Sequence, residues 1–352
     1  MNEPPLVSLD AVDPGDDRLL AAFALLAAAR EGRTRQSSRY VDLELTDATT
    51  TVAAKVWEDD GGAQDAALAL AAAGTAAVKV LFHAESYQGR LQLKVHRIRA
   101  VADAEPGFDP VQLYGEGYEQ VADLFCATLV FDIETVPAVA RRDLPPTIAE
   151  SLAKTAQRME SDETKVMSLS PFFGKVVSLA VGDGDAPADE QRITVLVVPP
   201  PDTDPGGLPE WIRPMSEPAL LRAWWCLAAR ARTVVSYNGR GFDVPFLQAR
   251  SLIQGIPARI DLLSRRYNLR PHLDLYAVLT NGRALGPTNL DVVCWSLGID
   301  SPKGEMDGSM VAPAYEKGEI EKIAHYNAHD VRATTEVFRR VREQILRYRE
   351  EW

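Results

Sequence analysis

The sequence contains little cysteine. Among its 352 residues only Cys126, Cys226 and Cys294 occur, far apart and in apolar contexts. This spacing supports neither a disulfide framework nor a zinc site, since both need several cysteines or histidines at close spacing. We therefore expect a protein of a reducing compartment, the cytoplasm.

Long apolar segments are missing as well. No run approaches the roughly 20 apolar residues that a membrane-spanning helix needs. The opening segment, MNEPPLVSLDAVDPGDD, is acidic and contains prolines, unlike a secretory or mitochondrial signal. We expect no membrane partner, and we expect residues 1–16 to be disordered.

Positive charge is scarce, because 38 lysines and arginines face 50 aspartates and glutamates, for a net charge of −12. Binding of nucleic acid depends on where the charges lie rather than on their sum. Two segments differ from the average: residues 30–39 hold four arginines and one glutamate, and residues 90–99 hold four basic residues and no acidic one. An acidic chain that acts on nucleic acid usually needs a divalent metal at its site.

The length favours two domains, and residues 17–102 form the first. Alternating apolar residues predict four strands, at 40–45, 52–57, 77–83 and 91–98. An alanine-rich helix is predicted at 63–73. A fifth strand would cover residues 19–30, although their alanines and leucines favour helix locally. Strands, one helix and then strands is the order of a five-stranded OB barrel.

The segments RYVDLELTDATTTVAAKVW and VKVLFHAESYQGRLQLKVHRI resemble the OB-type domains attached to some bacterial exoribonucleases. OB barrels bind single strands through stacked bases and backbone charge. Phe82 is expected in the core, and a purely scaffolding barrel is the alternative. The candidate substrate-binding residues here are Arg35, Arg39, Trp57, Tyr87 and Lys94.

Residues 103–120, polar and rich in glycine and proline, predict a linker to a second domain at 121–352. Apolar strands and helical stretches mix in this second domain, which is the pattern of an α/β fold. Strands are expected at 128–133, 175–181, 194–198 and 233–237, and helices at 217–231, 245–252 and 319–349.

Three segments of this domain carry carboxylates that are candidates for a metal site. Asp132 and Glu134 lie two apart in the apolar run LVFDIET, so they share one face of a buried strand. Two carboxylates in such a place cost several kcal/mol per ion unless compensated, and a bound dication is the simplest compensation. Asp243 precedes a helical run, where a simple capping role is the alternative. Tyr326 and Asp330 lie four apart on a helix that is otherwise an ordinary amphipathic one.

Jointly, the segments FDIETVP, SYNGRGFDVPFL, HLDLYAVL and IAHYNAHDVRATTEVF resemble the motifs of the DEDD exonuclease superfamily, in the branch with a tyrosine four residues before the last aspartate. The likeness is greatest to bacterial proteins related to the proofreading domain of family B DNA polymerases, and it covers residues 124–341. It implies an RNase H-like mixed sheet flanked by helices, and 3′→5′ exonuclease activity on single-stranded DNA or RNA with a free 3′ end.

The resemblance also implies a site. Asp132, Glu134, Asp243 and Asp330 would hold two divalent ions, Mg²⁺ or Mn²⁺, which suit hard carboxylate oxygens. Asp132 would bridge the ions, and Tyr326 would orient the attacking water or contact the scissile phosphate. Substrate-binding residues would be Asn238, Arg240 and Phe242 in the second motif, and Lys303 in the loop of residues 301–308.

Two alternatives stay open. The sequence also contains His325 five residues before Asp330, the spacing of the histidine branch of exoribonucleases. Five residues turn a helix by 500°, which leaves His325 about 140° from Asp330, whereas Tyr326 is within about 40°. A protein with the same fold but no catalysis, which only binds nucleic acid, is the second alternative. Four retained carboxylates argue against it, and the choice between DNA and RNA is left open.

Overall fold

The computed structural model describes residues 3–58, 62–73, 76–102, 105–201, 203–264, 268–286, 288–300, 306–349 and 352. The chain divides into two compact units, Met1–Gln120 and Val121–Trp352. Within the described residues, no helix is both long and apolar enough to cross a membrane.

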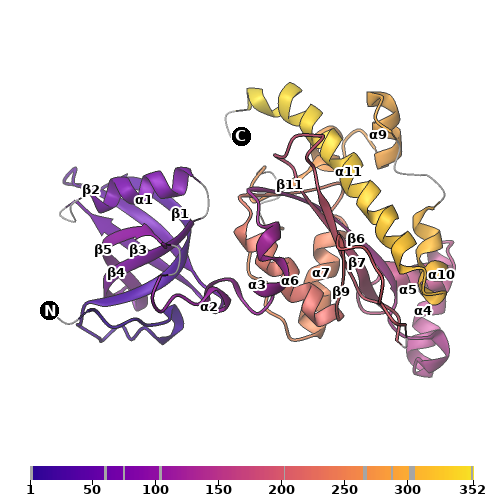
Figure 1. The fold of residues 1–352 in the computed structure, drawn as a ribbon, viewed down its shortest axis with the longest axis horizontal. Helices are drawn as coiled ribbons and strands as arrows, with labels where there is room; N and C mark the ends of the chain where they lie inside the picture. Colours follow the sequence, from indigo (N-terminus) through magenta and orange to yellow (C-terminus); the bar gives the residue numbers. More distant parts are fainter. Residues whose placement is uncertain are drawn as a thin grey trace. The chain divides into compact units, whose positions relative to one another are not determined.

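The first unit is a closed five-stranded barrel in the order β1-β2-β3-β5-β4 (Figure 1). Its apolar residues alternate along each strand, so that Val41, Leu43 and Leu45 fill the interior together with Phe82, which is buried as expected. The OB-type arrangement is confirmed. Its elements are β1 (Leu20–Arg33), β2 (Arg39–Thr46), β3 (Thr51–Trp57), α1 (Ala63–Ala72), β4 (Ala76–Tyr87) and β5 (Arg90–Ala100).

One expectation about the edges of the barrel is wrong. Residues 1–16 are expected to be disordered, but Leu9 lies in a short 3-10 helix (Leu9–Ala11) and is buried in the barrel core. The expected linker, 103–120, stays a prediction. Its described residues include α2 (Pro110–Tyr114) and most of α3 (Tyr118–Val121), and Leu113 and Tyr114 are buried.

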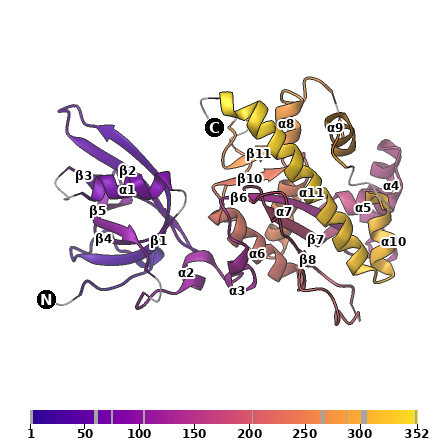
Figure 2. The ribbon, with the colours of Figure 1, turned by 45° about the horizontal axis from the view of Figure 1, so that its top comes forward.

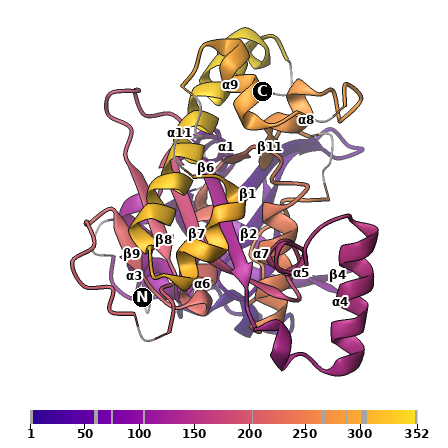
Figure 3. The same cartoon turned by 90° about the vertical axis from the view of Figure 1, so that its right-hand side faces the viewer.

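The second unit is a six-stranded mixed sheet in the order β11-β10-β6-β7-β8-β9. Strands β6, β7 and β8 form an antiparallel meander, and β10 and β11 add to β6 in parallel. With helices on both faces, this confirms the predicted RNase H-like class (Figure 3). The strands are β6 (Thr128–Pro137), β7 (Gly174–Asp183), β8 (Ile193–Val197), β9 (Ile212–Pro214), β10 (Thr233–Ser236) and β11 (His272–Asp274).

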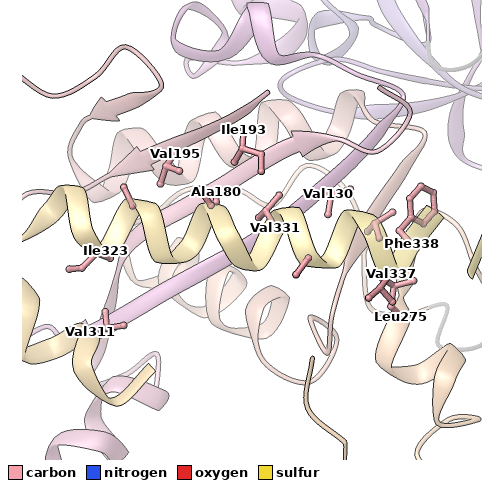
Figure 4. Close-up of a cluster of buried hydrophobic side chains, with 14 of the residues drawn as sticks. Val130, Ala180, Ile193, Val195, Leu275, Val311, Ile323, Val331, Val337 and Phe338 are labelled. Carbon is pink, nitrogen blue, oxygen red and sulfur yellow. The ribbon is translucent and has the colours of Figure 1, made fainter. Parts of the chain in front are cut away.

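Helix α11 covers one face of this sheet, where Val331 packs with Val130, Ala180 and Val195 (Figure 4). On the other face Phe131 of β6 contacts Trp224 of α6, with ring centroids 4.2 Å apart. Asp132 and Glu134 point to the face of Val130, because residues two apart in a strand share a side. The helices are α4 (Pro146–Arg158), α5 (Glu163–Leu169), α6 (Glu217–Arg230), α7 (Asp243–Ile253), α8 (Leu275–Leu279), α9 (Leu290–Leu297), α10 (Val311–Glu316) and α11 (Ile320–Gln344).

Candidate active site

Three carboxylates meet between β6 and α11. Asp132, Glu134 and Asp330 each offer one oxygen atom, and these atoms all lie within 4.8 Å of one another. Asp132 and Glu134 come from the central strand, and Asp330 comes from the helix that covers it. Oxygens of acidic side chains at this spacing form a donor set that suits a hard divalent cation.

Asp243 is tied to this cluster by a hydrogen bond from the backbone of β6. Strand β10 pairs with β6 only from Thr128 to Val130. Beyond that point, the N–H of Ile133 donates to Asp243 Oδ1 at 3.3 Å. Asp243 is the first residue of α7, and the N-cap residue before it is Phe242. The bond to Ile133 therefore fixes Asp243 beside Asp132.

The carboxylates of the cluster repel one another. Burial raises the pKa of Asp132 well above its ordinary value, and the charges of Asp243, Asp330 and Glu134 raise it further. Burial, followed by the charges of Asp330 and Asp243, raises the pKa of Glu134 in the same way. Burial also raises the pKa of Asp243, to about 7. Every neighbouring charge that shifts the pKa of Asp132 or Glu134 is thus another carboxylate, the condition that a dication relieves.

Tyr326 and His325 point in different directions from α11. Burial and then the charge of Asp330 raise the pKa of Tyr326, with further contributions from Glu134, Asp132 and a hydrogen bond to Asp330. The side chain of His325 is 58% exposed, lies 3.8 Å from Glu321 and contacts the ring of Trp211. The structure therefore brings Tyr326, and not His325, to the carboxylates.

The loop after β10 is held by Asp274. Its carboxylate accepts hydrogen bonds from the backbone N–H groups of Asn238 at 2.9 Å and Arg240 at 3.2 Å. The guanidinium of Arg240 donates to the carbonyls of Leu263, Asn268 and His272. Arg240 thus supports the fold of this loop, and its expected contact with substrate stays a prediction.

Other expected substrate-binding residues have varied surroundings. Asn238 has a left-handed backbone, with φ at 63°, and its side chain accepts a hydrogen bond from Arg283, a residue that the sequence analysis missed. Phe242 is half-buried against Phe246, with ring centroids 5.5 Å apart. Lys303 lies outside the described residues.

On the barrel, Trp57 and Lys94 lie on the outer face of β3 and β5. Trp57 contacts the ring of Tyr40, and Lys55 Nζ lies 4.0 Å from the centroid of Tyr40. Lys55 stands next to Lys94 in the β3–β5 register. The outer face therefore combines aromatic rings with two lysines, of which Lys55 also lies 3.1 Å from Asp42 and was missed from the sequence.

The remaining barrel candidates differ in their charge partners and exposure. Arg39 was expected to bind substrate, but its guanidinium lies 3.1 Å from Glu31 and 3.0 Å from Asp65. These exposed ion pairs are weak, and the expected contact of Arg39 with substrate stays a prediction. Arg35 is exposed in the turn between β1 and β2. Tyr87 is 59% exposed and borders a surface pocket of about 810 Å³ near the start of β3.

Comparisons with known proteins agree with the motifs. Residues 212–348 match the model of a family described as a predicted 3′-5′ exonuclease related to the exonuclease domain of PolB. A DNA polymerase from Desulfurococcus sp. (strain Tok) is 29% identical over 118 residues, and the match spans 30% of this chain and 15% of the polymerase.

Two solved structures are also similar. The family B DNA polymerase from Pyrobaculum calidifontis aligns with 91% of this chain and 46% of its own, at 15% identity and a TM-score of 0.43. The second OB-fold domain of replication protein A from Methanococcus maripaludis aligns with 30% of this chain and 99% of its own, at 14% identity and a TM-score of 0.21. The resemblance to the exonuclease domain of family B polymerases is confirmed by the family match over residues 212–348, which include Asp243, Tyr326 and Asp330.

Proposed function

We propose that this chain is a metal-dependent exonuclease that removes nucleoside 5′-monophosphates from the 3′ end of single-stranded nucleic acid. The observation that carries the proposal is the convergence of Asp132, Glu134 and Asp330 within 4.8 Å, with Asp243 fixed beside them. This oxygen donor set fits Mg²⁺ or Mn²⁺. When bound, two such ions supply an activated water and stabilise the leaving 3′ oxygen.

The four acids would have separate roles. By the resemblance to the DEDD motifs, Asp132 would be the ligand shared by the two ions. Glu134 and Asp330 would complete one ion site, and Asp243 would contribute to the other. The raised pKa of Tyr326 keeps its hydroxyl protonated at neutral pH. Tyr326 therefore acts as a hydrogen-bond donor that orients water or a phosphate oxygen, and not as a base.

The test uses full-length protein and single-stranded DNA or RNA labelled at the 5′ end, with Mg²⁺, Mn²⁺ or EDTA. A ladder that shortens from the 3′ end and release of nucleoside 5′-monophosphates, both blocked by EDTA, support the proposal. Internal cleavage, degradation from the 5′ end, or no product with either metal would overturn it. Tight strand binding without any product would instead favour the non-catalytic binding protein. The two labelled substrates also decide between DNA and RNA.

We propose in addition that the barrel holds the single strand. The support is its outer face, where Lys55 and Lys94 accompany Tyr40 and Trp57, since stacking is worth about 1–3 kcal/mol per base. Deleting residues 1–105 should raise the KM for long single strands and spare turnover of very short ones. Trp57→Ala in the full chain should raise the same KM less. Equal KM values and equal salt dependence for all three proteins would mean that the barrel is a scaffold.

A further inference from the structure

Arg283 is an exposed arginine held in one place by two neutral side chains. It lies in the sequence between α8 and α9, two helices that Figure 2 labels. Its Nη2 donates to Asn238 Oδ1 at 2.9 Å, and its guanidinium carbon lies 5.5 Å from the ring centroid of Tyr276. Neither an amide oxygen nor a tyrosine ring neutralises the charge, so the guanidinium is both oriented and positive.

The backbone of both hydrogen-bonded residues is strained. Asn238 has φ at 63° and Arg283 has φ at 80°, in the left-handed region that residues other than glycine rarely adopt. Arg283 is further fixed by its own N–H, which donates to Thr280 Oγ1 at 3.0 Å. Strained residues persist where the surrounding structure determines them, and they are concentrated at functional sites.

The Arg283–Asn238 pair lies against the backbone of Gly241. A Cβ at position 241 would come within 2.3 Å of Arg283 Nη2 and 2.6 Å of Asn238 Oδ1. Gly241 is two residues before Asp243, and Asp243 is bonded to the backbone next to Asp132. The guanidinium therefore packs on the short segment that leads into Asp243.

Two other arginines of this region are already engaged. Arg240 donates to three backbone carbonyls, and Arg250 forms a buried pair with Glu217. A phosphodiester that approaches four acidic side chains is repelled unless positive charge accompanies it. A planar guanidinium is the side chain best suited to pair with phosphate oxygens.

We propose that Arg283 binds a phosphate of the strand whose 3′ end lies at the carboxylate cluster, with Asn238 and Tyr276 as its positioning residues. This inference rests on the proposed function for the identity of the ligand. Among the described residues, the side chain of Arg283 contacts Asn238 through one nitrogen and the ring of Tyr276 through its face, so its other N–H groups can donate to a ligand.

The test compares Arg283→Gln and Arg283→Lys in the full-length chain. Arg283→Gln should raise the KM for single strands about tenfold, the loss expected for one charge-assisted hydrogen bond, and leave kcat nearly unchanged. The slope of log binding constant against log salt concentration should fall by about 0.7, the value for one phosphate contact on a single strand. Arg283→Lys should keep most of the slope. Gly241→Ala, which displaces the pair, should reproduce the KM effect.

Arg347→Gln is the matched control. Arg347 is also exposed and lies over a tyrosine, Tyr348, at 5.1 Å. It follows the end of α11, which lies about 21 Å along the helix from Asp330 at 1.5 Å per residue. Its removal should leave both KM and salt slope unchanged.

The outcomes for Arg283 and for the proposed function can be told apart. If the wild-type chain degrades strands and Arg283→Gln keeps the wild-type KM and salt slope, the assignment of Arg283 is wrong and the nuclease stands. If the wild-type chain binds strands without cleaving them and Arg283→Gln still lowers the slope, the phosphate contact is supported and the proposed function is wrong. Thermal unfolding of each variant at the wild-type temperature shows that the fold is retained.

Discussion

Two buried acidic regions of the second unit differ in how their charge is compensated. Glu217 accepts two hydrogen bonds from Arg250, at 2.9 and 2.7 Å, one from the N–H of Val176 at 3.0 Å and one from Gln254 at 3.2 Å. Around Asp132 and Glu134, by contrast, the neighbouring charges that shift the pKa values are carboxylates.

The difference separates a structural acid from a functional one. A buried charge with a complete set of donors is part of the fold, and its loss leaves a partner unpaired. A buried group of like charges is not compensated by the folded chain alone, and it lowers the stability of the fold until a cation binds. Both regions lie in the same unit and are built on strands and helices, so the contrast does not reflect different kinds of structure.

The largest expected effect breaks the functional region. Asp132→Asn should lower exonuclease turnover by about 10³-fold or more, since the shared ligand is lost. Its stability without metal should equal or exceed that of the wild type, because mutual repulsion falls. Turnover is measured with end-labelled strands and stability by thermal unfolding in EDTA. Substantial activity in the purified variant would contradict the mechanism.

The opposite result is expected for the structural region. Glu217→Gln removes the partner of Arg250 and should lower the free energy of unfolding by about 3–5 kcal/mol, the usual cost of an uncompensated buried charge. Chemical denaturation with and without Mn²⁺ measures it. If Glu217→Gln is no less stable than Asp132→Asn in EDTA, the distinction between the two regions fails.

Tyr326 tests how far the functional region extends. Tyr326→Phe should lower turnover about 10²-fold, because a protonated donor beside Asp330 is lost while the ring stays in place. His325→Ala, on the exposed side of α11, should change turnover only modestly. The reverse ranking would assign the chain to the histidine branch and replace the proposed role of Tyr326.

The smallest effect concerns pH. The pKa of Asp243 is raised to about 7 from an ordinary value of 3.8, so between these pH values the folded chain keeps a proton that the unfolded chain has lost. This contribution to stability is present below about pH 4, decreases as the pH rises and is gone above about pH 7. In EDTA the wild type should therefore lose more stability between pH 5, which lies inside this transition, and pH 8, about one unit above it, than Asp243→Asn does. Equal losses would show that Asp243 titrates normally.

The motifs and the periodicity of the sequence predicted much of this molecule. Strand β1 is confirmed although its alanines favour helix, because pairing with β2 and β4 outweighs a weak local preference. The motif spacing also anticipated that Asp132, Glu134 and Asp330 would come together. These predictions succeed because strand patterns are local in the sequence and because the acidic motifs occur in a fixed order along it.

What the sequence could not give depends on distant partners. Arg39 forms ion pairs with Glu31 and Asp65, and no local pattern shows that Asp65 lies within reach. The oriented guanidinium of Arg283 depends on a contact with Asn238, 45 residues earlier. The feature that draws attention to Arg283 is the left-handed backbone of both residues, and only the folded chain shows it.

The bond between Asp243 and Ile133 also has a consequence for folding. It joins residues 110 positions apart, and contacts that close such long loops form slowly because their entropy must be lost first. A partly folded chain that contains β6 but not the β10–α7 segment would present only part of the ligand set. High-affinity binding of metal during refolding should therefore appear only when the last long-range contacts form. The time course of metal binding would then report when the native sheet is complete.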